Sequence, residues 1–574
     1  MDDKKIGFNL EFALYVLSFI IALGFRLAWL GRLPLSDSEA TWALQALGLA
    51  RGEQVSVASH TLYVLLTQFL FSLFGDSNFV ARVVPALLGG SIVFAPYLFH
   101  RHLGRWAAVI LSFGLAIDPA MIAASRQPGS PMLAIVMFVF MAGFLINGYE
   151  AWAGVFGALA LMGGAGVWQA VVAVLLSLLW GKVLRRDREA DINAVDWAEI
   201  SWKKFLYWFA GSFVFASSFL LIQPRGLGAS LSSVVDYVSV WVKGGGVSLE
   251  IMLSALLMYE IFPLILGLSA IVLLLFRKDA LGGYLARLWV VLLVLLLAYS
   301  NKATVDLCLV VIPLWALAAR LVVRIVEGLS GEFWLFAFGY GAVVFALLVF
   351  VWLNLVSLLN PQPASASLLQ RYIVIAVSAV LIVVIALLVT IGWSQKHASY
   401  GLMVGAGIIF IIYTFSATWN SAGLGKNPDL ELWWSSPDLV ESGLMMKSIQ
   451  QISEWQHKGF RDQVDVWVIG VDLPSLKWFL RDLHNVVFSR VYPVGVSPSI
   501  VITTSEQVLS LADRYAGQDF VWWRGLPLWT GLDVSGRFRW IAFREASQDY
   551  RALILWVRSD LFPGTGVLAG QPTP

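Results

Sequence analysis

Residues 11–30 read EFALYVLSFIIALGFRLAWL, an apolar stretch long enough for one bilayer crossing. Similar stretches recur along the chain. Of its 574 residues, 59% are hydrophobic and only 13% are charged, whereas a soluble globular protein has about a quarter charged residues. The composition therefore predicts a polytopic α-helical membrane protein.

At about 20 residues per crossing, we expect about thirteen transmembrane helices, of which the first is not cleaved. The predicted spans are residues 11–30, 79–99, 106–123, 131–147, 152–165, 167–184, 205–222, 251–275, 283–299, 305–323, 333–358, 372–392 and 399–417. Lys and Arg are richer in the loops on the side of the N-terminus, which predicts a cytoplasmic N-terminus. An odd number of spans then places the C-terminus outside, as in a multi-pass protein of the plasma membrane.

The first outer loop, residues 31–78, contains two further apolar segments, 38–51 and 61–74. Both are shorter than a bilayer crossing, so we expect helices that lie along the membrane interface. Such a loop suits an enzyme that holds a lipid tail and a polar head at the interface. A transporter is a weaker alternative, because the hydropathy shows no internal repeat of the kind that transporters carry.

The composition shifts after about Trp419. Turn residues appear there, and charged residues become about as frequent as in a soluble protein. This predicts two domains: a transmembrane domain, residues 1–419, and an extracytoplasmic α/β domain, residues 420–574. We expect helices at 436–455, 476–483 and 507–515, and strands at 464–469, 486–489, 500–503 and 520–523. The domain has no Gly-rich phosphate loop and no metal-ligand spacing.

Several partner classes can be set aside from the composition. The net charge of +2 and the absence of basic runs argue against a nucleic-acid partner. The single cysteine, Cys308, lies in an apolar segment, so neither an intramolecular disulfide nor a thiolate metal site is expected.

Two carboxylates, Asp37 and Glu39, follow the first span, where charged groups are scarce. Sugar transfer from a lipid phosphate needs a carboxylate base for the acceptor and cations for the departing phosphate. Either acid could be the base. The candidate cations on the outer face are Arg126, Lys302, Arg82 and Arg225. Local structure is the competing explanation: Asp37 could be a helix N-cap and Glu39 a first-turn acid.

Several motifs together resemble those of a known family. They are Asp37-Ser38-Glu39-Ala40, His60-Thr61-Leu62-Tyr63, the stretch from Leu73 to Leu87, Ser125-Arg126, Tyr259-Glu260 and the segment from Trp478 to Asp482. This succession is similar to that of the GT-C glycosyltransferases, membrane enzymes that use polyprenyl-phosphate sugars. The family includes protein O-mannosyltransferases and the lipid A aminoarabinose transferase. The likeness is greatest to its flippase-activity-associated branch.

The resemblance implies a donor and a set of site residues. It implies a polyprenyl-phosphate-linked sugar as donor, and a protein, glycan or lipid as acceptor. It implies Asp37 as the base with Glu39 in support. His60, Arg126, Lys302 and Arg82 would line the substrate site, the cations holding the phosphate. No metal ligand is assigned, and the need for a divalent metal stays open.

This chain also departs from the pattern of that branch. Its usual His-Asp-Glu-Ala aligns with Asp37-Ser38-Glu39-Ala40, so Ser38 stands where the catalytic acid is expected. Two hypotheses follow. The chain is an inverting transferase of a hexose or pentose, or it is a catalytically degenerate homologue that serves as an accessory subunit and offers its C-terminal domain to partner subunits. Glu260 is expected to make a helix–helix hydrogen bond.

Overall fold

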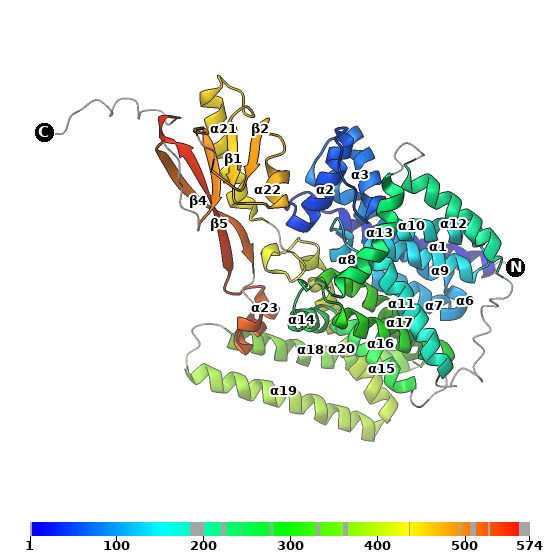
Figure 1. Cartoon of the computed structure of the whole chain (residues 1–574). Helices are drawn as coiled ribbons and strands as arrows, with labels where there is room; N and C mark the ends of the chain where they lie inside the picture. Colours follow the sequence, from blue (N-terminus) through cyan, green and yellow to red (C-terminus); the bar gives the residue numbers. More distant parts are fainter. Residues whose placement is uncertain are drawn as a thin grey trace.

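The computed structural model describes residues 3–183, 200–219, 225–242, 244–274, 276, 279–328, 333–359, 365–434, 437–492, 495–505, 513–525 and 529–561. A large helical part is followed by a smaller part that contains a sheet (Figure 1). The helices before the sheet are α1 (Asp3–Leu27), α2 (Asp37–Ala50), α3 (Thr61–Phe74), α4 (Asn78–Ser91), α5 (Ala95–Leu98), α6 (His100–Leu103), α7 (Arg105–Ile117), α8 (Pro119–Ser125), α9 (Met132–Ile146), α10 (Glu150–Met162), α11 (Gly166–Val183), α12 (Trp202–Ser217), α13 (Arg225–Val240), α14 (Leu249–Tyr259), α15 (Ile261–Leu274), α16 (Ala280–Ala298), α17 (Leu307–Gly328), α18 (Phe333–Leu358), α19 (Ser365–Gly392) and α20 (Gln395–Ser421).

Long apolar helices make this a multi-pass membrane protein. In the described ranges, 8 helices are long and apolar enough to cross a membrane, and up to 10 if each of two bent pairs is one span. The bent pairs are α7 with α8, at 57°, and α14 with α15, at 88°.

The thirteen predicted spans all fall on helices, but three fall on shorter ones. These are α9, α10 and α12, and the end of the predicted span 205–222 lies outside the described residues. The number thirteen therefore stays a prediction.

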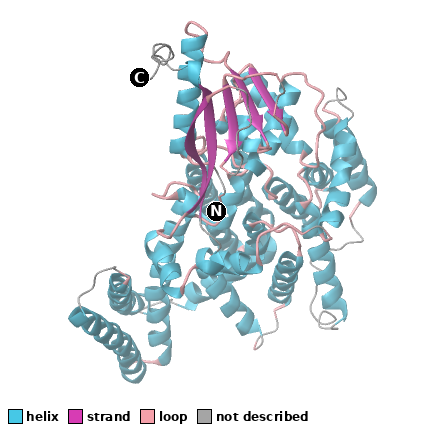
Figure 2. Cartoon of the chain, turned by 60° about the vertical axis from the view of Figure 1, so that its left-hand side comes forward, coloured by secondary structure: helices cyan, strands magenta, loops and turns pink. Residues whose placement is uncertain are grey.

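The C-terminal part is an α/β unit, as the alternating pattern predicts. Its sheet has the strand order β2-β1-β3-β5-β4, in which β1 pairs in parallel with β2 and β3 while β5 pairs antiparallel with β3 and β4. Figure 2 shows this sheet standing at one end of the helical part. The elements are α21 (Leu439–Gln456), β1 (Asp465–Ile469), α22 (Pro474–Phe479), β2 (Asn485–Ser489), β3 (Ile500–Thr504), β4 (Tyr515–Gly525), α23 (Val534–Phe543) and β5 (Asp549–Arg558).

Most predicted elements that fall on described residues of this unit are present, and one strand is longer than predicted. The predicted helix 507–515 falls mainly on residues outside the described ranges, and Tyr515 itself begins β4. The predicted strand 520–523 is only the second half of β4, because pairing with β5 extends the strand toward its N-terminus. The sequence analysis also missed α23 and β5. Strand β5 alternates buried and partly buried side chains from Leu553 onward, a pattern typical of a strand with one face in a core.

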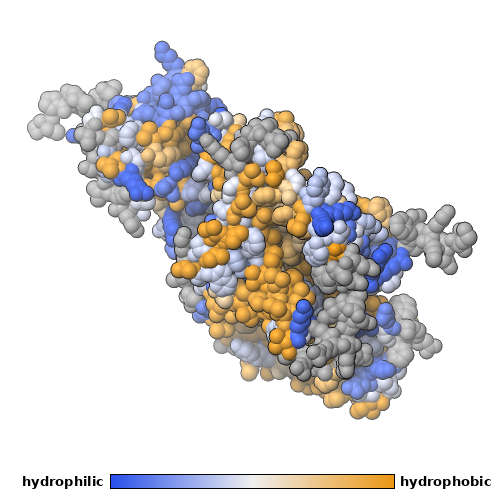
Figure 3. Space-filling model, turned by 45° about the vertical axis from the view of Figure 1, so that its right-hand side comes forward, coloured by the Kyte–Doolittle hydropathy of each residue, from blue (hydrophilic) through white to orange (hydrophobic). Residues whose placement is uncertain are grey.

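The two short helices predicted in the first outer loop are present as α2 and α3. They pack against each other and lie between the rest of the helical part and the sheet (Figure 1). Figure 3 shows hydrophobic residues over the middle of the visible face and hydrophilic residues gathered toward its ends. Helices α2 and α3 therefore lie beside the sheet unit, where α2 packs against α22.

Candidate functional site

Helix α2 begins with a capping box that uses one of the two candidate acids. Ser36 is the N-cap, its hydroxyl accepts from the Glu39 backbone N–H, and the Glu39 carboxylate accepts from the Ser36 backbone N–H at 2.9 Å. The suggestion that Asp37 is the N-cap is therefore wrong. Ser36 takes the position because its backbone is extended, whereas Asp37 is already the first helical residue.

Glu39 also forms a buried ion pair with Arg82 of α4. Arg82 donates from Nε to Oε1 and from one terminal nitrogen to Oε2, each at 2.7 Å. Its remaining donors reach the carbonyl oxygens of Leu30, Leu33 and Pro34 at 2.6–3.3 Å. A guanidinium has five N–H groups, so all five of Arg82 are used. We call these residues, with Ser36, the Glu39 network.

The Glu39 network leaves neither charged partner free for chemistry. Glu39 is fully buried and Arg82 is 2% exposed. Both Glu39 oxygens accept hydrogen bonds, and a phosphate could bind Arg82 only by displacing one of its bonds. The structure therefore assigns these two residues a role in holding the loop after α1 against α2 and α4.

The side chain of Arg126 also donates hydrogen bonds to backbone carbonyls. It follows α8 and is 3% exposed, and one terminal nitrogen donates to the carbonyls of Phe25, Arg26 and Ala28 at 2.8–3.0 Å. The last carbonyls of a helix lack intrahelical donors, so a cation at this end is favourable. Arg126 thus caps the C-terminus of α1. Its Nε is buried and has no hydrogen-bond partner among the described residues.

Lys302 is less constrained than the arginines. It is half-buried in the loop between α16 and α17, and its Nζ donates to the Tyr299 carbonyl at 3.2 Å. An ammonium group has three N–H donors, so Lys302 keeps donors for a ligand. Arg225 begins α13, but its side chain lies outside the described part.

His60 precedes α3 and packs its ring against Trp42 of α2, with ring centroids 4.3 Å apart. Gly164 lies against the other side: a Cβ there would stand 2.6 Å from His60 Cε1. Burial lowers the pKa of His60 to about 4, although Asp236 acts in the opposite direction. His60 is thus neutral at physiological pH and does not supply a cation for phosphate.

Asp37 occupies a different environment from Glu39. Its side chain is exposed, and its Oδ1 accepts from the backbone N–H of Ser475 at 3.0 Å and from the Ser475 hydroxyl at 2.5 Å. Ser475 lies in the first turn of α22, so this contact joins the first outer loop to the sheet unit. Within the described ranges, the other carboxylate oxygen of Asp37 has no hydrogen-bond partner. We call this pair the Asp37 contact.

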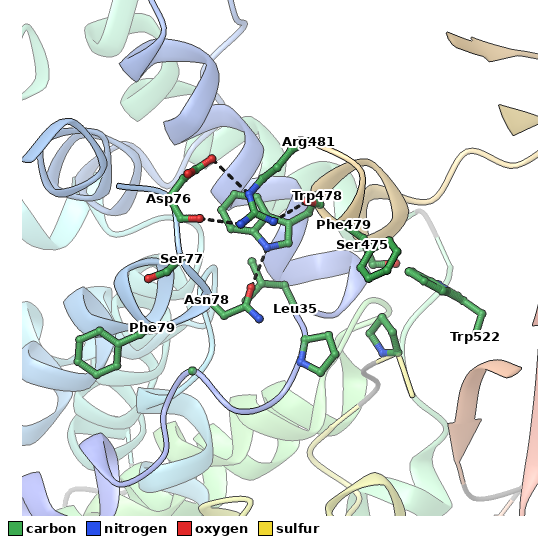
Figure 4. Close-up of a pocket in the computed structure, with 13 residues that line it drawn as sticks. Leu35, Asp76, Ser77, Asn78, Phe79, Ser475, Trp478, Phe479, Arg481 and Trp522 are labelled. Atoms are coloured by element: carbon green, nitrogen blue, oxygen red, sulfur yellow. Dashed lines mark hydrogen bonds and ion pairs between the residues drawn. The ribbon is translucent and has the colours of Figure 1, made fainter. Parts of the chain in front are cut away.

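Ser475, the partner of Asp37, lines a cavity of about 370 Å³ (Figure 4). The turn before α4 and other residues of α22 also line it. Arg481 stacks on Trp478 at 4.1 Å and donates to the Asp76 carboxylate at 3.2 Å. The Trp478 indole donates to Asn78 at 2.8 Å. The cavity therefore lies at the seam of the two parts, with polar groups already fixed in its wall.

The sequence analysis missed this seam. Asp76, Asn78, Trp478 and Arg481 all stand in motifs that carried the family resemblance, yet none was proposed as a site residue. The signal was the co-occurrence of an acid in one motif and an Arg in the other, but no local pattern shows that two segments 405 positions apart pair with each other.

Glu260 meets its expectation. It lies at the break between α14 and α15, and its Oε1 accepts from the backbone N–H of Ala120 in α8 at 3.1 Å. This is the predicted helix–helix hydrogen bond. Nowhere in the described ranges do three or more His, Cys, Asp or Glu side chains stand together as a group that could hold a metal ion.

Comparisons with known proteins bear on the fold. No family model matches the chain, and no curated protein matches it. Two solved structures of ArnT from Cupriavidus metallidurans are similar. One, bound to undecaprenyl phosphate, has a TM-score of 0.53 at 12% identity, and the apo structure has 0.51 at 14%. Each match covers 96% of this chain and 98% of ArnT. Over nearly its whole length, the chain therefore has the fold of ArnT.

Proposed function

We propose that this protein is a membrane glycosyltransferase that moves a sugar from a polyprenyl-phosphate donor to an acceptor on the outer face of the membrane. The acceptor is a protein, a glycan or a lipid. The fold supports the reaction class, since an ArnT structure of the same fold was solved with undecaprenyl phosphate bound. In this arrangement the N-terminus is cytoplasmic and residues 420–574 lie outside.

The observation that carries the proposal is the environment of Asp37. A general base must reach the acceptor's proton, so its carboxylate needs a free oxygen at an accessible place. Asp37 is exposed and is oriented by Ser475 through one oxygen, and Ser475 also lines the seam cavity. In the proposed mechanism the acceptor enters from this cavity, Asp37 takes its proton, and the acceptor oxygen attacks the sugar carbon.

The other residues have supporting roles in the proposed mechanism. The attack breaks the bond between the sugar and the phosphate, with inversion at the sugar carbon, and the phosphate departs as an anion. Lys302 is the cation with donors to spare for that phosphate. Glu39 acts indirectly, because its bonds to Ser36 and Arg82 fix the first turn of α2, where Asp37 stands.

A second candidate function is that of an accessory subunit with a degenerate site. The commitment of all five N–H groups of Arg82 to internal partners favours it, because this arginine is not free to hold a phosphate. In that case the C-terminal domain would serve as the surface for partner subunits.

Transfer of labelled sugar from polyprenyl-phosphate donors tests the proposal, in membranes that contain wild type, Asp37→Asn or Glu39→Gln. Loss of a general base lowers rates by about 10²–10⁴-fold, and we expect this for Asp37→Asn. Asn keeps an oxygen that can accept from Ser475, so the contact persists while the base is removed.

Glu39→Gln serves as the matched comparison, because it alters a buried acid two residues away. We expect it to reduce the amount of folded protein more than the rate per folded molecule. Equal rates in all three proteins would exclude Asp37 as the base. A wild type without transfer from any donor would favour the accessory function.

A further inference from the structure

The segment Leu430–Trp434, here called the strap, runs from the end of α20 toward the sheet unit. It crosses the neighbourhood of three predicted site residues. Gln127, next to Arg126, donates to the Trp433 carbonyl at 2.8 Å, and Thr304, two residues after Lys302, donates to the Leu432 carbonyl at 2.9 Å. The guanidinium of Arg82 lies 6.0 Å from the centroid of the Trp434 ring. The strap therefore contacts the neighbours of Arg126 and Lys302 and lies close to Arg82, although these positions are spread over more than 200 residues of the sequence.

The strap is buried, yet two of its polar groups lack partners. Trp433 and Trp434 are 4% and 9% exposed. Among the described residues, neither indole N–H has a hydrogen-bond acceptor, and the same is true of the buried Nε of Arg126. An unsatisfied buried donor is unfavourable, because it has lost its hydrogen bonds to water without a replacement. Each of these three donors lacks an acceptor among the described residues.

The nearby charges indicate what kind of acceptor would suit these donors. The charged groups that act on Arg126 are Arg82 and Arg26, which are positive, and Glu39, which is negative. The Glu39 oxygens are already occupied by Arg82 and Ser36. Glu39 and Glu431, the second of which belongs to the strap, are each paired with an arginine, whereas Arg126 donates only to backbone carbonyls and keeps a free donor. A phosphate has several oxygens that can accept hydrogen bonds from these donors, and its negative charge is attracted by Arg126.

We propose that Trp433 and Trp434 of the strap, with Arg126, form a subsite for the phosphate of the lipid-linked donor, in which their free N–H groups donate to phosphate oxygens. This rests on the proposed function and adds two residues from outside the transmembrane helices to the site. The strap also links the subsite to the sheet unit: Trp540 of α23 donates to the Leu430 carbonyl at 2.8 Å, and Glu431 pairs with Arg544 at 3.0 Å.

Binding of radiolabelled polyprenyl monophosphate to the full chain in lipid nanodiscs tests the subsite without requiring turnover. Trp433→Phe and Trp434→Phe keep an aromatic ring and remove only the N–H. A hydrogen bond to a charged group contributes about 1.5–3 kcal/mol, so we expect each variant to weaken binding by roughly tenfold or more. Trp289→Phe is the matched control, because Trp289 in α16 is another buried indole without a partner.

Two further probes identify the source of the phosphate. Inorganic phosphate that competes with the lipid only weakly assigns the subsite to the lipid headgroup, whereas equal competition overturns that assignment. Uncharged polyprenol should bind equally to wild type and to both strap variants. If polyprenol loses affinity in the same way, the indoles act by packing and the proposal fails.

The remaining outcomes separate this proposal from the proposed function. Unchanged lipid-phosphate affinity in both strap variants, or the same loss in Trp289→Phe, overturns the subsite even if the protein transfers sugar. Conversely, a protein that shows the expected affinity losses but transfers no sugar keeps the subsite and loses the proposed activity.

Discussion

The first turn of α2 holds two acids in opposite environments. Glu39 faces inward, fully buried, and both of its oxygens are bonded to Arg82 and Ser36. Asp37 faces outward and contacts Ser475 through one oxygen, while its other oxygen stays free within the described ranges. They are neighbours in sequence, but one belongs to the interior of the helical part and the other to the seam with the sheet unit.

This difference separates a structural carboxylate from one available for chemistry. A buried charge is retained only when its hydrogen-bonding capacity is filled, because desolvation is costly. A catalytic base needs the reverse: orientation through part of the carboxylate and one oxygen left for the acceptor. The resemblance to GT-C enzymes names both acids as site residues. Their contacts favour Asp37 for the chemistry and Glu39 for its support.

The largest effect is expected from breaking the Glu39 network. Arg82→Met leaves the Glu39 carboxylate buried without its cation, which costs about 3–5 kcal/mol of folding free energy. Denaturant titration in detergent measures the loss. Arg51→Met is the control, because the Arg51–Asp76 pair at 3.4 Å is partly exposed and such pairs contribute about 0–1 kcal/mol. Similar losses in both variants would contradict the assignment of Arg82 to the interior.

A smaller effect is expected from the protonation of His60 at acidic pH. The folded pKa of His60 is about 4 and that of an unfolded His about 6.5. Between these values the unfolded chain binds a proton that the folded chain does not, so stability falls as pH decreases from 6.5 toward 4. The limit is about 1.4 kcal/mol per pH unit, and we expect less because the ring is partly exposed.

Thermal melts of wild type and His60→Gln between pH 7 and pH 4.5 measure this effect. The Gln variant is neutral throughout, so its melting temperature should fall less on acidification than that of wild type. Parallel curves would show that His60 is accessible to protons in the folded state.

The smallest effect is expected from the Asp37 contact. Ser475→Ala removes one partly buried hydrogen bond to a carboxylate, and we expect a loss of about 1 kcal/mol in stability. If the contact orients the base, the same variant lowers the transfer rate by more than this loss of folded protein explains. The double variant with Asp37→Asn should then be no slower than Asp37→Asn alone. Additive losses in rate would mean that Ser475 acts elsewhere.

Much of the fold could be predicted from local pattern. The apolar stretches located the long helices, and the segments 38–51 and 61–74 matched α2 and α3 within a residue. Strands β1, β2 and β3 also lay where alternation and turn residues placed them. Strand β4 was predicted too short, since its N-terminal half is set by pairing with β5 rather than by its own hydrophobicity.

The candidate site could be predicted only as a list of residues. The resemblance selected Asp37, Glu39, Arg82 and Arg126. Charge and spacing do not show which of these side chains already use their hydrogen-bonding groups within the protein. The strap was not predicted either, because aromatic residues are also typical of buried segments that bind no ligand. Their missing hydrogen-bond partners become visible only once the neighbours are in place.

By itself, then, the sequence determined the membrane class and the positions of most helices and strands. These depend on contacts within a few residues, where hydrophobic period and side-chain chemistry act directly. Only the tertiary structure decided the roles of the charges. Arg82 meets Glu39 across 43 positions, and Ser475 meets Asp37 across 438. Whether a carboxylate is neutralised or left free depends on which distant segment packs against it, and that follows from the burial of apolar surface elsewhere in the chain.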